Sequence, residues 1–160
     1  IGVAASKNEY VLFFDADGSH NPEDINFSIR DLTLKKPFLV NIGNPHIIFF
    51  DDEIEKYDVE SFGSLIENDS LFPEKINVSF AKLKSDNHIV LNVWERGAGK
   101  TNACGTAACA TAVAGVEMGL IKNKVTVTLP GGDLEIYYKS NDNIIMTGPT
   151  ETNFTDKYKL

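Results

Sequence analysis

The sequence has no apolar run of the roughly 18 to 20 residues that a membrane-spanning helix requires, and it has few cysteines and histidines. Its first residues do not form the basic, apolar and small-residue series of a signal peptide. Two cysteines are too few for the disulfide framework of a small secreted protein, so we expect a cytoplasmic protein. His20, His46 and His88 are scattered and no His/Cys pair has ligand spacing, so we expect no metal site.

Positive charge is also scarce. The chain has 15 Lys and Arg residues against 23 Asp and Glu residues, which gives a formal net charge of -8. This charge repels phosphate backbones and anionic lipid headgroups, so we expect neither nucleic acid nor a membrane as a partner. The hydrophobic content of 42% in 160 residues is enough for one domain with its own core. Because the chain starts at Ile1 and not at methionine, we expect it to be a fragment.

Short segments rich in β-branched and aromatic residues recur along the chain, each bounded by Gly, Pro, Asn or Asp, as is typical of strands. The predicted strands are residues 10–14, 38–42, 46–50, 76–80, 88–94, 125–129, 134–138 and 144–146. The strands 125–129 and 134–138 predict a hairpin with a loop at 130–133. Residues 59–67 predict a helix capped by Asp58, and residues 15–37 predict a long irregular connection.

A second helix is predicted over residues 105–120, where nearly every side chain is apolar or small. A helix without a polar face is expected to be buried on all sides, and its many Ala and Gly residues let strands approach closely. We therefore predict an α+β fold in which a curved mixed β-sheet or barrel wraps around this central apolar helix.

Cys104 directly precedes this helix. A thiol at a helix N-terminus faces unpaired N–H groups and the positive end of the dipole, which favours a lowered pKa. The N–H groups of Gly105 and Thr106 suit a substrate carboxylate. The alternative is that Cys104 is a small buried hydrophobe, as free cysteines often are. Cys109 lies about 140° around the helix and is expected to pack in the core.

Polar residues near Cys104 suggest an amino-acid site. Glu95 and Arg96 end a predicted strand, where charges are usually solvated, but here they suit a substrate ammonium and a substrate carboxylate respectively. His46 follows a Gly-Asn-Pro turn and is a candidate for modulating protonation near neutral pH. Asn77, by composition alone, is a polar residue in a strand.

The sequence Gly99-Lys100-Thr101 resembles the end of a phosphate-binding loop. That motif requires a glycine five residues before its Gly-Lys pair, and Trp94 stands there, which excludes a nucleotide site of this kind.

Five segments together resemble the diaminopimelate epimerase family in order and spacing. They are Asn-Ile-Gly-Asn-Pro-His at 41–46, Phe-Pro-Glu-Lys-Ile-Asn at 72–77, the Glu-Arg-Gly and Ala-Cys-Gly-Thr stretch within 94–110, Leu-Pro-Gly-Gly-Asp-Leu at 129–134 and Met-Thr-Gly-Pro at 146–149. The match runs from about residue 38 to the C-terminus. The resemblance implies a diaminopimelate epimerase-like fold with two similar halves and the substrate between them. By this resemblance, residues 1–149 are the C-terminal substrate-binding domain, and residues 150–160 cross back to an N-terminal domain that this chain lacks.

The resemblance also implies a function. It is that of a cofactor-independent epimerase that interconverts LL- and meso-diaminopimelate, for lysine and peptidoglycan synthesis, with two cysteines as acid and base. Cys104 matches one of the two cysteines, and the other belongs to the N-terminal domain, so this chain alone is expected to be inactive. The resemblance also implies that the full-length protein is a homodimer. The matching substrate-binding positions are Asn44, Asn77, Glu95, Arg96, Gly105 and Thr106, and those that tune the cysteine pair are His46 and Glu95.

Two alternatives remain open. A related racemase with another substrate shares the duplicated architecture; phenazine-enzyme-like relatives lack the cysteine pair, so Cys104 argues against them. A non-catalytic amino-acid-binding module would keep the pocket without turnover.

Overall fold

A computed structural model describes residues 2–5, 11–14, 26–29, 32–140 and 143–150. Its main element is a ten-stranded sheet of order β1-β2-β5-β6-β7-β8-β10-β11-β12, with β9 paired to β8. The sheet is mixed, because β6 and β7 run parallel, as do β8 and β10, whereas the other pairs are antiparallel. The strands are β1 (Gly2–Ala5), β2 (Val11–Phe14), β5 (Phe38–Asn41), β6 (Pro45–Phe50), β7 (Asn77–Ser85), β8 (His88–Glu95), β9 (Gly99–Thr101), β10 (Lys124–Leu129), β11 (Gly132–Tyr137) and β12 (Ile145–Thr147).

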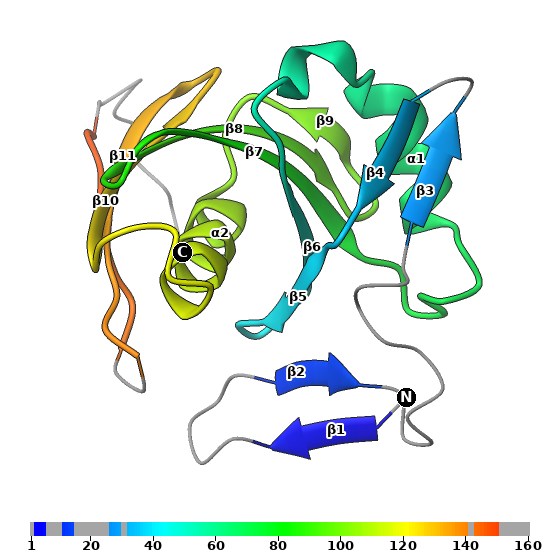
Figure 1. Cartoon of the computed structure of the whole chain (residues 1–160), viewed down its shortest axis with the longest axis horizontal. Helices are drawn as coiled ribbons and strands as arrows, with labels where there is room; N and C mark the ends of the chain where they lie inside the picture. The colour runs from blue at the N-terminus through cyan, green and yellow to red at the C-terminus, as the bar shows by residue number, and fades with distance from the viewer. Residues whose placement is uncertain (1, 6–10, 15–25, 30–31, 141–142, 151–160) are drawn as a thin grey trace, which may run out of the picture.

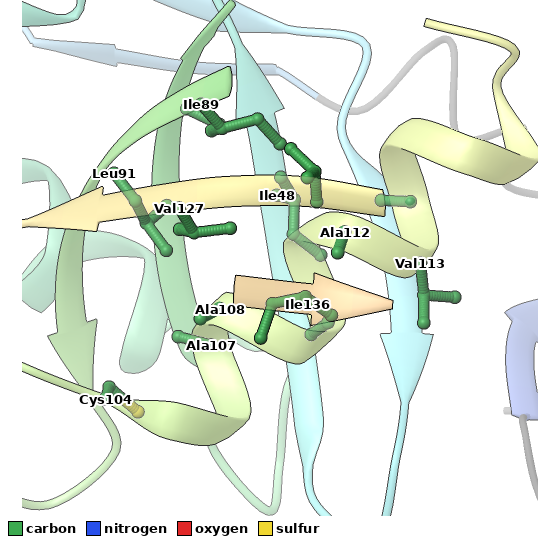
Figure 2. Packing of buried hydrophobic residues seen from close by; sticks show 14 of the residues in the cluster. Ile48, Ile89, Leu91, Cys104, Ala107, Ala108, Ala112, Val113, Val127 and Ile136 are labelled. Atoms are coloured by element: carbon green, nitrogen blue, oxygen red, sulfur yellow. The ribbon is translucent and has the colours of Figure 1, made fainter. Parts of the chain in front are cut away.

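Helix α2 (Gly105–Glu117) lies on the concave side of this curved sheet (Figure 1). It contacts β5, β6, β7, β10 and β11, and its buried positions are almost all Ala, Gly, Thr or Val. Figure 2 shows Ala108 and Ala112 among larger side chains of the sheet, such as Leu91, Val127 and Ile136. Small helix residues let the strands close around the helix, so the predicted curved mixed sheet around a central apolar helix is confirmed.

Helix α2 ends three residues before the predicted end. Gly119 has φ +69°, its N–H donates to the carbonyl of Val116, and the N–H of Leu120 donates to the carbonyl of Gly115. These two bonds form a Schellman motif, in which a glycine in the left-handed region ends the helix.

The opposite face of the sheet carries a second layer. It contains helix α1 (Val59–Glu67), the 3-10 helix η2 (Ile54–Lys56) and a hairpin of β3 (Asn26–Ile29) and β4 (Leu32–Lys35). Strand β6 is buried on both faces, because Ile47 and Phe49 pack in this layer while Ile48 packs against α2. The predicted helix 59–67 and its Asp58 cap are confirmed. The predicted irregular connection is wrong for the described residues between 26 and 35, which form the hairpin.

The hairpin of β10 and β11 is tighter than predicted. Leu129 pairs with Gly132, so the turn consists of Pro130 and Gly131 alone. The N–H of Gly131 donates to the carbonyl oxygen of Asn102 at 2.7 Å, and a Cβ on Gly131 would lie 2.8 Å from that oxygen. The turn therefore supports the segment that leads into Cys104. No helix in the described part of the chain is both long and apolar enough to cross a membrane.

Candidate active site

A pocket of about 740 Å³ lies at the N-terminus of α2, a volume typical of small-molecule sites. Four residues proposed from the sequence line it together, namely Glu95, Cys104, Gly105 and Thr106. Apolar side chains that sequence reasoning did not find form another part of the wall: Ile42, Ile144 and Met146. The structure thus brings polar groups from β8 and α2 to one apolar-rimmed cavity.

Cys104 is the N-cap residue of α2 (Figure 2). Only 6% of its surface is exposed. Its Sγ donates to Oε2 of Glu95 at 3.1 Å and lies 3.5 Å from Oγ1 of Thr106. Burial raises the pKa of the Cys104 thiol; the Thr106 hydroxyl and the Ala107 N–H lower it, and the Glu95 carboxylate raises it further, with a net rise. The predicted lowering of this pKa is therefore wrong, because burial and a neighbouring carboxylate outweigh the helix N-terminus.

A hydrogen-bonded chain leads from Thr106 to His46. Asn44 Nδ2 donates to Oγ1 of Thr106 at 3.4 Å, and Asn44 Oδ1 lies 3.1 Å from Nε2 of His46. A carboxamide oxygen only accepts, so Nε2 of His46 carries a proton. Asn44 and His46 thus reach the thiol through Thr106.

His46 is fully buried in β6. Burial lowers its pKa to about 4, although the Glu95 carboxylate raises it, and the Arg96 guanidinium lowers it. His46 is therefore neutral at pH 7 and is a fixed donor to Asn44. His46 therefore acts on the site as a neutral donor and does not itself titrate near neutral pH, because the sheet excludes the water that would solvate an imidazolium.

Asn77 joins the two loops of the site. Its Nδ2 donates to the carbonyl of Pro45 at 2.8 Å, and its Oδ1 accepts the N–H of Arg96 at 3.0 Å. The exposed Arg96 side chain donates from Nη1 to the carbonyl of Glu74 at 3.2 Å. Neither Asn77 nor Arg96 lines the pocket beside Cys104, so in this structure they hold its loops.

Two further roles were not predicted from the sequence, namely the pocket contact of Cys109 and the buried position of Glu67. Cys109 is half-buried, and it packs against the core as predicted but also lines the pocket; burial, with Cys104 nearby, raises its pKa to about 11. Glu67 is a buried carboxylate on α1 that accepts from Trp94 and Gly97. No sequence signal distinguishes Glu67 from a solvated helix end, because its partners lie about 30 residues away.

No group of three His, Cys, Asp or Glu residues suited to a metal ion occurs within the described ranges. The fold and the site together define a sheet-wrapped-helix domain that presents a protonated thiol, a carboxylate and helix N–H groups to one small-molecule pocket. The family model for diaminopimelate epimerase matches residues 38–152, and the chain belongs to this family.

Curated relatives agree with this membership. A "Diaminopimelate epimerase" from Erythrobacter litoralis is 52% identical over 121 residues, which cover 76% of this chain and 45% of the relative. One from Methylocella silvestris is 48% identical over 133 residues, which cover 82% of this chain and 46% of the relative. The chain thus spans about half the length of the curated relatives that it matches.

Among solved structures, a phenazine biosynthesis protein of the PhzF family from Bacillus anthracis aligns with a TM-score of 0.47 and 21% identity. The alignment covers 66% of this chain and 34% of that protein.

Proposed function

We propose that the protein to which this chain belongs interconverts LL- and meso-diaminopimelate by acid–base chemistry at Cys104, without a cofactor. The observation that carries this proposal is the Cys104 thiol, hydrogen-bonded to Glu95 in a pocket at the start of α2. The names of the curated relatives support the choice of substrate.

The chemistry follows from the groups around the pocket. As the first residues of α2, Gly105 and Thr106 have N–H groups without partners inside the helix, and these suit the carboxylate of the substrate. Removal of the α-proton places negative charge on that carboxylate, which the N–H groups stabilise. Because the pKa of Cys104 is raised, its thiol gives a proton to the α-carbon in one direction, and its thiolate removes the proton in the other.

Inversion of a stereocentre also needs a second group on the opposite face of the α-carbon. Cys109 does not suit this role, because it belongs to the helix that Cys104 caps and therefore comes from the same domain. We assign the second thiol to an N-terminal domain outside these 160 residues. The chain alone then binds substrate without turnover.

The two segments of the chain and the polar residues near Cys104 have further roles in the whole protein. Residues 1–149 form the C-terminal substrate-binding domain, and residues 150–160 cross to the N-terminal domain; residues 151–160 lie outside the described part of the chain. Asn44, Asn77, Glu95 and Arg96 bind the polar groups of the substrate once both domains enclose it. The full-length protein is a cytoplasmic homodimer.

Deuterium incorporation at the α-carbon of LL- and meso-diaminopimelate in D2O, measured by mass spectrometry, tests the proposal. The samples are this chain, a version extended upstream in its gene, and the extended version with Cys104→Ala or Cys109→Ala. We expect exchange only in the extended protein, abolished by Cys104→Ala and retained in Cys109→Ala. Binding without exchange in the extended protein would instead identify an amino-acid-binding module, and exchange of another amino acid alone would identify a racemase with a different substrate.

A further inference from the structure

Glu67 is a carboxylate that the proposed chemistry does not use, yet it is 96% buried with three donors around it. Its relative exposure is 4%, and its Oε2 accepts the indole Nε1–H of Trp94 at 2.7 Å. Its Oε1 accepts the N–H of Gly97 at 2.9 Å and lies 3.5 Å from Nζ of Lys75. Burial raises the pKa of Glu67, but the donors from Trp94, Gly97 and Lys75 outweigh burial and hold the pKa below its ordinary value.

Helix α1 is shaped to receive the indole of Trp94. Gly63 precedes Glu67 by one helical turn, so both residues lie on the same face of α1. A Cβ on Gly63 would lie 2.7 Å from Cδ2 of the indole, so only glycine leaves room for the ring. Gly97, with φ +78°, turns the backbone so that its N–H reaches the same carboxylate.

The segment held in this way carries two residues of the site. Trp94 and Gly97 flank Glu95 and Arg96, and both flanking residues donate to one side chain. Glu95 contacts the Cys104 sulfur, and the N–H of Arg96 donates to Asn77. The Glu67 carboxylate therefore fixes both ends of a four-residue segment whose middle meets the thiol.

We propose that Glu67 is a positioning residue, whose carboxylate clamps Trp94 and Gly97 and thereby sets where Glu95 meets Cys104. Its relevance to turnover rests on the proposed function. The positioning itself is a property of this chain and is measured without substrate. A purely structural Glu67 would alter stability and leave the environment of the thiol unchanged in the folded protein.

The first readout is the indole ¹H–¹⁵N resonance of Trp94. The chain gives a single such resonance, because Trp94 is its single tryptophan. In Glu67→Gln a neutral oxygen replaces the charged acceptor, so we expect the indole proton to move upfield. Glu60→Gln, which neutralises an exposed carboxylate on the same helix, is the matched control and should leave the resonance in place.

The second readout is the pH dependence of Cys104 alkylation by iodoacetamide, in a Cys109→Ala background so that one thiol reacts. Loss of the clamp lets the Glu95 carboxylate move from the sulfur, so Glu67→Gln should shift the alkylation midpoint to lower pH. A shift of about half a unit raises the rate at pH 7 roughly threefold. Because Glu67 acts through Glu95, the double variant Glu67→Gln/Glu95→Gln should behave like Glu95→Gln alone.

An unchanged midpoint in folded Glu67→Gln, or additive shifts in the double variant, would overturn the proposal. If Glu67→Gln does not fold, Trp94→Phe removes one donor and keeps the carboxylate; we expect a smaller shift in the same direction, and no shift would again refute the clamp. Absence of α-proton exchange in the extended protein without substitutions, with all these readouts as expected, would refute the epimerase assignment and leave the positioning role intact.

Discussion

The sulfur of Cys104 lies 3.1 Å from carboxylate oxygen Oε2 of Glu95 and donates to it. A carboxylate accepts a hydrogen bond from a thiol but repels a thiolate, so this contact favours the protonated cysteine. The contact opposes the field of the α2 N-terminus, to which Cys104 is the N-cap. The pair therefore supplies a proton donor oriented by its acceptor.

Replacement of Glu95 by glutamine should lower the pKa of Cys104, because the repulsion between carboxylate and thiolate disappears. We expect the thiolate absorbance near 240 nm to develop at lower pH in Glu95→Gln than in the parent chain, both with Cys109→Ala. Glu95→Asp, which keeps the charge, should remain closer to the parent. A midpoint that stays fixed or rises in Glu95→Gln would contradict the role of this contact.

Stability should fall in mildly acidic solution because of His46. Burial lowers its pKa to about 4 from 6.5, so between these values the unfolded chain binds a proton that the folded chain does not. The contribution of neutral His46 to the free energy of unfolding is fully present above pH 6.5. It declines by up to about 3 kcal/mol as the pH falls to 4. Urea unfolding at pH 7, 5.5 and 4.5 measures this decline, which should flatten in His46→Gln. His88→Gln is the control, and an equal flattening there would refute the assignment to His46.

Asn77→Ala should destabilise the fold, because it removes a buried side chain that bonds both the carbonyl of Pro45 and the N–H of Arg96. The expected loss is about 2 to 3 kcal/mol in the free energy of unfolding. Asn123→Ala, at an exposed position, should change stability by less than about 0.5 kcal/mol. Chemical denaturation of both variants gives the comparison; equal, small effects would show that the bridge between the two loops contributes little.

The variant Gly63→Ala tests whether helix propensity or packing against Trp94 has the larger effect on the stability of the fold. In an exposed helix this change stabilises by roughly 1 kcal/mol, but here the new Cβ would overlap the indole of Trp94. We therefore expect a net loss of about 1 to 3 kcal/mol, together with a shift of the Trp94 fluorescence as the ring moves. Ser64→Ala, at the exposed neighbouring position, should be neutral or slightly stabilising. A more stable Gly63→Ala protein would show that the indole moves without cost.

The fold was largely predictable because its signals are local. The apolar residues on both faces of β6 and the small residues along α2 predict directly that these elements are buried. The two-residue turn at Pro130 and Gly131, the helix end at Gly119 and the hairpin of β3 and β4 were not predicted. Each depends on a backbone conformation or a pairing that composition alone does not specify.

The site was predictable to the extent that its residues lie in motifs. Glu95, Cys104, Gly105 and Thr106 were named from the sequence and line one pocket. The directions in which the pKa values of Cys104 and His46 shift were not predictable from the sequence, because burial by distant strands sets them. The bridging contacts of Asn77 and the clamp at Glu67 likewise join positions up to 32 residues apart.

The sequence by itself determined the family, the apolar helix and the cysteine at its start, since these follow from residue order, periodicity and spacing. Tertiary structure alone decided that the thiol is protonated, that His46 is neutral, and that Glu67 holds the loop beside the cysteine. The reason is that charge states and buried hydrogen bonds depend on the exclusion of water by segments remote in sequence.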